Sequence, residues 1–256
     1  MAGLAYDSHV SAGGALYLFS SGTLEAEGIE VPVPFYLIRH PAGVVVIDGG
    51  NPIEAVRDPH AHWGALADHF RLHMTEAQHC VAQLRKLGVA PHSVRHIVQT
   101  HLHMDHTGAL GHFPEATVVV HGRELDAAHA ANSETSGYVR ADFDRAGLEW
   151  QRVEGELDLF DDGTIQLLHT PGHTPGHMSV VLDLKETGRV LLTADAVDNR
   201  GQWEGRLPLR ALDSRDDAQR SLERLRVLAR ETDALVVLGH DPDNWAQLKH
   251  APDVYR

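Results

Sequence analysis

The stretch His101-Leu-His-Met-Asp-His106 places three imidazoles and one carboxylate within six residues. It follows Val94-Arg-His-Ile-Val-Gln-Thr100, an apolar and partly β-branched run that is typical of a buried strand. The first two histidines are two positions apart, so an extended backbone can turn both toward one metal ion. The aspartate and the last histidine lie in the following turn and can face a second ion. The stretch therefore predicts metal ligands at the C-terminal end of a strand.

Three further candidate ligands, His173, Asp195 and His240, each follow an apolar run as well. Imidazole and carboxylate are the ligands that a borderline divalent ion such as zinc prefers, and seven of them without a thiolate suit two adjacent ions. A chance cluster of such groups would be costly to bury without a cation. The sequence thus predicts a paired-metal hydrolase whose metal ligands are His101, His103, Asp105, His106, His173, Asp195 and His240.

The order and spacing of these seven residues resemble the metallo-β-lactamase superfamily. Within it, the chain is most similar to the N-acyl-homoserine and γ-butyrolactone lactonases, and the likeness runs nearly end to end. The supporting segments are Val31–Phe35, His40–Gly50, Gly239–Asp243 and Ala251–Tyr255. The resemblance implies an α/β fold, a four-layer αββα sandwich of two mixed β-sheets flanked by helices.

The same resemblance implies a role for each candidate residue. Asp195 would bridge the ions, with His101, His103 and His173 on one ion and Asp105, His106 and His240 on the other. Asp48 would orient a metal-bound histidine, and His177 would support the site without binding metal. Two divalent metal ions are expected, with zinc (Zn²⁺) as the default and iron, cobalt or manganese also compatible with the donors.

The implied reaction is the opening of a lactone ring by a metal-bridging hydroxide. The expected substrate is an N-acyl-homoserine lactone, whose hydrolysis quenches quorum signals, or a small γ-lactone. Asp105 is the candidate catalytic residue that passes a proton to the leaving oxygen.

One candidate catalytic position departs from the lactonase pattern. The lactonases usually carry a tyrosine three residues after the bridging aspartate, where this chain has Asp198. A carboxylate would repel a developing oxyanion, so Asp198 turns away, another donor serves, or the substrate differs. Hydrolysis of another ester, a thioester, an amide or a phosphotriester is therefore the main alternative, and binding of a lactone without turnover is a second.

Composition favours a single intracellular enzyme domain over residues 1–256. The net charge of -14 disfavours nucleic acid as a partner, and no stretch approaches the ~20 apolar residues of a membrane span. Residues 1–7 lack a signal-peptide pattern, which predicts a cytoplasmic protein. The one cysteine, Cys80, is expected to pack in the core. The expected partner is a small-molecule lactone or ester, and the resemblance is compatible with a homodimer.

Apolar patterning also predicts the order of elements. Strands are expected at 15–19, 35–39, 44–47, 94–100, 117–121, 165–169, 178–184, 190–193 and 235–238, and helices at 75–87, after 121, and at 216–230. Two stretches, 51–74 and 198–212, lack a regular pattern and are expected to form irregular loops. Their large apolar residues would line a channel for an acyl tail, or else serve loop packing or a dimer contact; these residues are Trp63, Phe70, Met74 and Trp203.

Overall fold

The computed structural model describes residues 14–130 and 136–256, so the predicted absence of an N-terminal signal falls outside the described residues. Strands form a seven-stranded first sheet, ordered β4-β1-β2-β3-β5-β6-β7, and a five-stranded second sheet, ordered β12-β11-β10-β9-β8. The first sheet contains β1 (Ala15–Ala26), β2 (Ile29–His40), β3 (Gly43–Ile47), β4 (Phe70–His73), β5 (Val94–Val98), β6 (Thr117–His121) and β7 (Glu149–Val153). The second contains β8 (Leu157–Asp158), β9 (Ile165–His169), β10 (Met178–Leu184), β11 (Gly188–Leu192) and β12 (Leu235–Val237).

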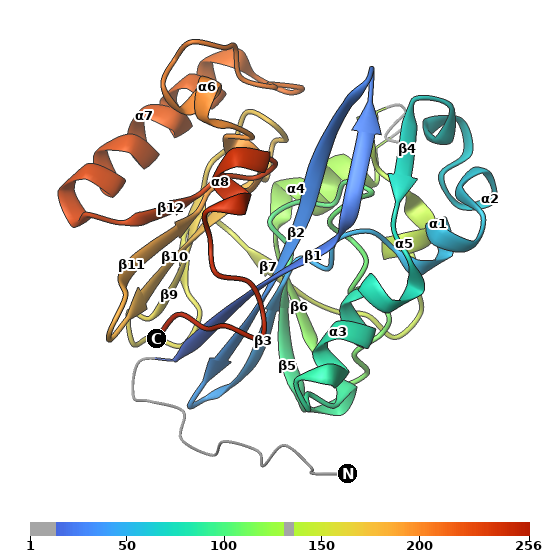
Figure 1. The fold of residues 1–256 in the computed structure, drawn as a ribbon, viewed down its shortest axis with the longest axis horizontal. Helices are drawn as coiled ribbons and strands as arrows, with labels where there is room; N and C mark the ends of the chain where they lie inside the picture. Colours follow the sequence, from blue (N-terminus) through green and yellow to red (C-terminus); the bar gives the residue numbers. More distant parts are fainter. Residues whose placement is uncertain (1–13, 131–135) are drawn as a thin grey trace.

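Helices flank the two sheets (Figure 1). They are α1 (Ile53–Arg57), α2 (Pro59–Trp63), α3 (Cys80–Lys86), α4 (Gly122–Ala128), α5 (Arg140–Phe143), α6 (Arg200–Trp203), α7 (Arg215–Thr232) and α8 (Pro242–Ala246). Both sheets contain parallel and antiparallel pairs, for example β2 with β3 antiparallel and β3 with β5 parallel. The predicted four-layer α/β sandwich with two mixed sheets is confirmed.

Successive side chains of a strand point to opposite faces of its sheet, and this alternation separates the core into layers. In β2, Phe35 and Leu37 pack toward α3, whereas Tyr36 and Ile38 pack between the sheets. The second sheet turns its other face to α7, where Leu222 and Leu225 are buried. Cys80 is fully buried in the cluster under α3, as predicted.

Strand direction brings the predicted ligands to one edge of the sandwich. β3 and β5 are parallel, so the segment after β5 lies beside the residues after β3. β11 and β12 are also parallel, so Asp195 and His240, which follow them, leave their sheet on the same side. The carboxyl ends of parallel strands therefore position the site.

Three expectations about local structure are wrong. Residues 51–74 are not irregular but contain α1, α2, a 3₁₀ turn and β4, because Asp58 caps α2 by accepting a hydrogen bond from the amide of Ala61 (3.0 Å) and Pro59 begins it. Residues 198–212 contain α6, capped in the same way by Asn199.

The predicted helix over 75–87 is divided. A 3₁₀ turn at Glu76–Gln78 is closed by a capping box between Thr75 and Gln78, and α3 starts only at Cys80. Between them, His79 has an extended backbone (φ -60°, ψ 143°). Its ring is turned inward, toward the carbonyl of Gly108 at 2.9 Å. The inward histidine interrupts the helix.

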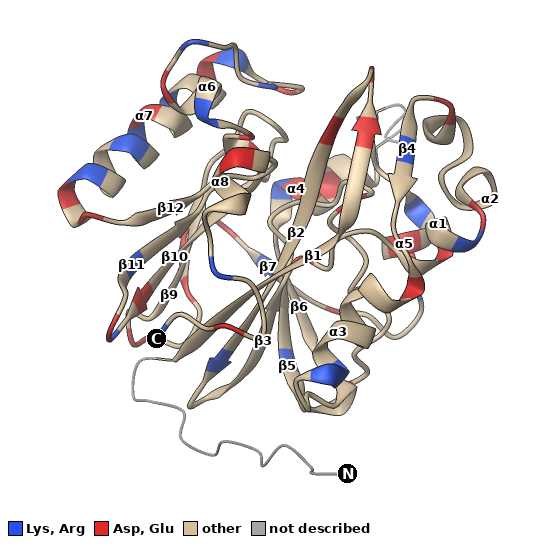
Figure 2. Cartoon of the chain, viewed as in Figure 1, with Lys and Arg blue, Asp and Glu red and all other residues tan. Residues whose placement is uncertain are grey.

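Among the helices that the structure describes, none combines the length and the apolar character that a bilayer crossing requires. In Figure 2, acidic residues lie at the tip of the β1–β2 hairpin and basic residues recur along α7. Charge of both signs is therefore distributed over this face.

Candidate metal centre

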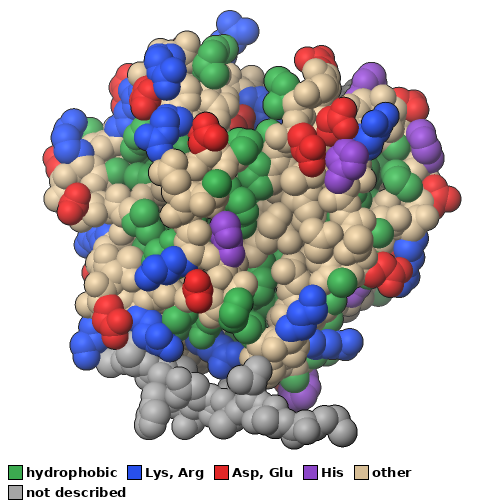
Figure 3. All heavy atoms as spheres, in the orientation of Figure 1, with side chains coloured by type: hydrophobic (Ala, Val, Ile, Leu, Met, Phe, Trp, Pro, Cys, Tyr) green, Lys and Arg blue, Asp and Glu red, His purple; other side chains and the backbone are tan. Residues whose placement is uncertain are grey.

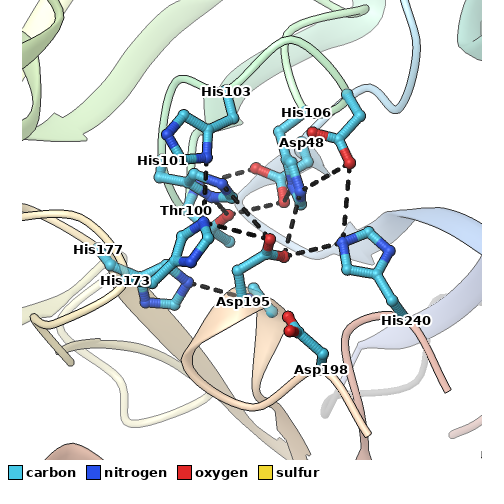
Figure 4. Close-up of polar contacts among 12 residues, drawn as sticks. Asp48, Thr100, His101, His103, His106, His173, His177, Asp195, Asp198 and His240 are labelled. Carbon is cyan, nitrogen blue, oxygen red and sulfur yellow. Dashed lines mark hydrogen bonds and ion pairs between the residues drawn. The ribbon is translucent and has the colours of Figure 1, made fainter. Parts of the chain in front are cut away.

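The structure brings the seven predicted ligands into one buried cluster (Figure 4). Ligand atoms lie within 4.8 Å of one another in four overlapping groups of three, and two of these groups together contain every predicted ligand except Asp195. One group is His101, His103 and His173, and the other is Asp105, His106 and His240. These are the two groups that the family resemblance implies.

Asp195 lies between the two groups. Its Oδ1 is 3.2 Å from His106 Nε2 and 3.1 Å from His240 Nε2. Its Oδ2 is 3.4 Å from His173 Nε2 and 3.8 Å from His101 Nε2. Each carboxylate oxygen thus faces one group, which is the geometry a bridging ligand needs.

The unsatisfied nitrogens of the cluster fit a metal ion. His101 Nε2 and His106 Nε2 are buried and form no hydrogen bond with acceptable geometry among the described residues, although Asp195 oxygens lie 3.8 and 3.2 Å from them. Buried polar atoms without a partner are rare in proteins because each costs its full desolvation energy. His173 Nε2 and His103 Nδ1 also face each other at 3.0 Å. Two neutral imidazoles at this distance share one proton in a hydrogen bond, and a divalent cation in place of that proton would accept a lone pair from each ring.

Electrostatics divide the cluster in the same way. Burial lowers the pKa of His103 to about 4 and holds the pKa values of His101 and His173 well below their usual range, so these rings are neutral and can donate lone pairs. At His240, burial is outweighed by the charge of Asp195, which raises the pKa to about 9. The carboxylates that favour a proton there would also favour a divalent cation.

Two buried carboxylates hold the segment 101–106 in place. Asp48 Oδ2 lies 2.9 Å from His106 Nδ1 and accepts a hydrogen bond from the Thr100 hydroxyl (2.8 Å). Its other oxygen accepts from the Thr100 amide (2.8 Å). The contact with His106 agrees with the predicted orienting role of Asp48, since it fixes which ring nitrogen faces the cluster.

Glu124, the second of these carboxylates, was not predicted. One oxygen accepts hydrogen bonds from the Leu102 amide and the Tyr138 hydroxyl (both 3.0 Å), and the other accepts from the Gly176 amide (3.2 Å). It therefore ties the loop of His101 and His103 to the loop that carries His173. A glutamate in an ordinary helical pattern gives no sequence signal for this role.

The remaining ligands are oriented mainly by the backbone. His173 Nδ1 lies 2.9 Å from the carbonyl of Arg210, and His240 Nδ1 lies 2.8 Å from the carbonyl of Pro32. His177 Nε2 accepts a hydrogen bond from the Asp195 amide (3.1 Å). His177 thus contacts the cluster from behind, as expected of a supporting residue.

Asp198 lies beside the cluster, with a carboxylate oxygen within 4.8 Å of ligand atoms of Asp195 and His240. Its Oδ2 accepts a hydrogen bond from Gln202 Nε2 (3.2 Å), and its Oδ1 accepts one from Arg210 Nη2 (3.3 Å). The same Arg210 nitrogen donates to Asp195 Oδ2. Arg210 was not predicted, because a lone arginine in the loop between α6 and α7 has no recognisable pattern.

A cavity of about 660 Å³ opens at the second group of ligands. Its polar floor contains Asp105, Asp198, Arg210 and His240, and its other wall is largely apolar, formed by Leu24, Ala26, Ile29, Val31, Leu66 and Phe70. A volume of this size is typical of small-molecule sites. Figure 3 shows hydrophobic side chains reaching the surface beside the β1–β2 hairpin.

Of the four large apolar residues expected to line a channel, only Phe70 lies in this cavity. Trp63 is 4% exposed and lines a separate cavity of about 490 Å³ that contains none of the seven ligands. Trp203 packs against the core under α7, and Met74 lines neither cavity. The strands β1, β2 and β4 supply the apolar wall instead, because the long β1–β2 hairpin extends past the edge of the sheet.

Comparison with known proteins agrees with this geometry. The model of the metallo-beta-lactamase superfamily matches residues 28–240. The chain belongs to this superfamily. Among its superfamily relatives, it is 43% identical to the N-acyl homoserine lactonase AttM of Agrobacterium fabrum (strain C58), with 94% of this chain and 98% of the relative covered.

Two further metallo-beta-lactamase relatives are lactonases. The N-acyl homoserine lactonase of a Bacillus species is 31% identical over 89% of this chain and 88% of its own length. The solved structure of an N-acyl homoserine lactone hydrolase, with N-hexanoyl-L-homoserine bound at its catalytic metal centre, superposes with a TM-score of 0.86. It is 26% identical, and the match covers 96% of this chain and all of that one (100%).

Proposed function

We propose that this protein is a dinuclear-metal hydrolase that opens the ester ring of N-acyl homoserine lactones. The main observation behind this proposal is that buried metal-ligand side chains lie beside a cavity with one apolar wall. The relatives with the highest similarity reported above are named for this activity.

The expected metal is zinc, because the donors are five imidazoles and two carboxylates without a thiolate. Two such cations lower the pKa of a bound water molecule and polarise an ester carbonyl. His101, His103 and His173 would hold one cation, and Asp105, His106 and His240 the other, with Asp195 shared.

Asp105 is the proposed acid for the leaving oxygen. Its Oδ2 lies 3.7 Å from His240 Nε2 and 3.8 Å from His106 Nε2, and its side chain is 11% exposed, at the wall of the cavity. It is thus the ligand best placed to pass a proton between the cluster and a substrate.

The cavity suits a neutral, partly apolar substrate. Its apolar wall can receive an acyl chain, whose burial is favourable by roughly 0.8 kcal/mol per CH₂ group. The acidic Glu27 also lines it, near the acidic hairpin tip, and would disfavour an anionic substrate. A lactone with an N-acyl tail meets both conditions.

The test is acid release near neutral pH by zinc-loaded protein. The panel contains short- and long-chain N-acyl homoserine lactones, γ-butyrolactone, a thioester, an aryl ester and a phosphotriester. Turnover of an acyl homoserine lactone at least ~100-fold faster than the thioester and the phosphotriester is the expected result. Turnover of γ-butyrolactone alone would narrow the substrate to small γ-lactones, and turnover of a non-lactone alone would reject the proposal.

Three further proposals rest on the sequence. We infer that residues 1–256 form one domain, that the protein acts in the cytoplasm, and that it pairs as a homodimer. Size-exclusion chromatography with light scattering tests the homodimer.

A further inference from the structure

Arg210 is attached to the metal centre at both its backbone and its side chain. Its carbonyl lies 2.9 Å from His173 Nδ1, and its guanidinium reaches Asp198 and Asp195 through Nη2. The side chain is 43% exposed although protein atoms surround it closely, because it faces the cavity. Among the described residues that line this cavity, Arg210 carries the one permanent positive charge.

Asp198 holds the guanidinium in this position. Its amide donates to Gln202 Oε1 (2.7 Å), and Gln202 Nε2 donates back to Asp198 Oδ2 (3.2 Å). Gln202 is itself buried, with 6% of its surface exposed. Both oxygens of Asp198 are thus engaged, and its charge is compensated by Arg210. The carboxylate is therefore not free to face a developing oxyanion.

One nitrogen of the guanidinium makes both carboxylate contacts. Arginine has five N–H donors in a planar fork that matches a carboxylate. Nη2 serves Asp195 and Asp198, and no described residue accepts a hydrogen bond from Nε or Nη1, so these donors can serve a molecule in the cavity. A tyrosine at position 198 would offer one hydroxyl donor, whereas Arg210 offers a charged fork.

We propose that Arg210, positioned by Asp198, binds the carbonyl oxygen of the lactone and then the carboxylate of the ring-opened product. This inference rests on the proposed lactonase function. Hydrolysis of a lactone creates a carboxylate in place of a neutral ester, and a permanent cation holds that anion more tightly than a hydroxyl does. Arg210 is then the substrate-contacting residue, and Asp198 is a positioning residue.

The experiment measures binding of N-hexanoyl-L-homoserine to zinc-loaded protein by titration calorimetry, alongside zinc content, kcat and KM. Arg210→Gln keeps the backbone carbonyl that orients His173 but removes the charge. We expect the product dissociation constant to rise about 10- to 100-fold and KM to rise, with zinc content unchanged. The neutral primary amide of the same product should lose much less affinity, because it has no carboxylate.

Arg206→Gln is the matched control. Arg206 lies on the same segment, is exposed and pairs with Glu204 (Nε to Oε2, 2.7 Å), and it lines neither cavity. It should bind the product as the wild type does. Asp198→Asn should change product affinity when Arg210 is present and leave it unchanged in the Arg210→Gln background, since a positioning residue acts only through its partner.

The outcomes separate this inference from the proposed function. A wild-type protein that opens the lactone, together with an Arg210→Gln variant of unaltered product affinity, would overturn the inference and leave the function standing. Loss of zinc from Arg210→Gln would also overturn it, because Arg210 would then be a support of the metal site. A wild-type protein that neither opens the lactone nor binds the product would overturn both.

Discussion

The two sheets contribute to the metal centre in different ways. The first sheet supplies four ligands from one segment, 101–106, which two buried carboxylates hold from behind. The second sheet supplies His173, Asp195 and His240 from three separate places, and backbone carbonyls orient both histidines. The first contribution is locally organised, whereas the second exists only when the whole sheet has formed. Asp195 is where the two contributions meet.

Removing Asp195 should have the largest effect, because it faces both groups of ligands. Asp195→Ala is expected to lower lactone turnover by at least ~1000-fold and to reduce the bound metal below two ions per chain. Metal analysis and kcat measure the two effects. Asp183→Ala removes an exposed carboxylate on β10 of the same sheet and should behave like the wild type. Full metal content in the Asp195→Ala protein would show that the sheets hold their ions independently.

A variant of Asp105 separates proton transfer from metal binding within the segment 101–106. Asp105→Asn keeps an oxygen donor of the same shape but cannot carry the proton. We expect kcat to fall at least ~100-fold with much of the metal retained. An unchanged kcat would exclude Asp105 as the acid. A fall in kcat that is fully explained by loss of metal would show that Asp105 acts only as a metal ligand.

Glu124 tests whether the first sheet's ligands depend on their carboxylate supports. In Glu124→Gln, an amide NH₂ group would meet either the Leu102 and Tyr138 donors or the Gly176 donor. A support of this kind is worth roughly 10- to 100-fold in metal affinity. Competition with a chromophoric chelator measures it, with Glu115→Gln as control because Glu115 is exposed in the turn before β6. Equal metal affinities in the two variants would show that the first sheet's ligands do not depend on a carboxylate support.

The same contrast explains what the sequence could predict. The segment 101–106 is recognisable because its spacing is local, and apolar patterning located β1, β2, β3, β5, β6, β9, β10, β11, β12 and α7. His173, Asp195 and His240 were assigned to their groups only through the family resemblance, since no local pattern joins them. The strands β7 and β8 were missed because they are short edge strands with largely exposed or half-buried side chains.

Contacts that span the fold could not be predicted. Glu124 and Arg210 act on residues 22 and 37 positions away, and each looks ordinary in its own stretch of chain. The apolar cavity wall was predicted only in part for the same reason: Phe70 lines it as expected, but Leu24, Ala26, Ile29 and Val31 come from β1 and β2. Its residues come from strands whose alternating pattern shows that one face is buried, but not what that face covers.

The smallest effect concerns the support beneath the first sheet's segment. His79 is 3% exposed, and its Nε2 lies 2.9 Å from the Gly108 carbonyl, just beyond the last ligand of the segment. Burial, reinforced by the neighbouring His112, lowers its pKa to about 4 from the ordinary 6.5. The unfolded chain therefore takes up a proton at His79 between pH 6.5 and pH 4, where the folded chain does not. The free energy of unfolding must fall as the pH falls through this window.

Metal-free protein isolates this contribution, since acid also releases metal from histidine ligands. In urea unfolding at pH 7 and pH 4.5, the wild type should lose more stability than His79→Gln, by on the order of 2 kcal/mol. His79→Gln is expected to be less stable at pH 7, because it loses packing around the Gly108 carbonyl, but to depend less on pH. His92→Gln, which removes an exposed imidazole, should keep the wild-type dependence. An equal fall in the free energy of unfolding for the wild type and His79→Gln would mean that acid weakens the fold elsewhere. The segment 101–106 would then owe its stability to Asp48 and Glu124.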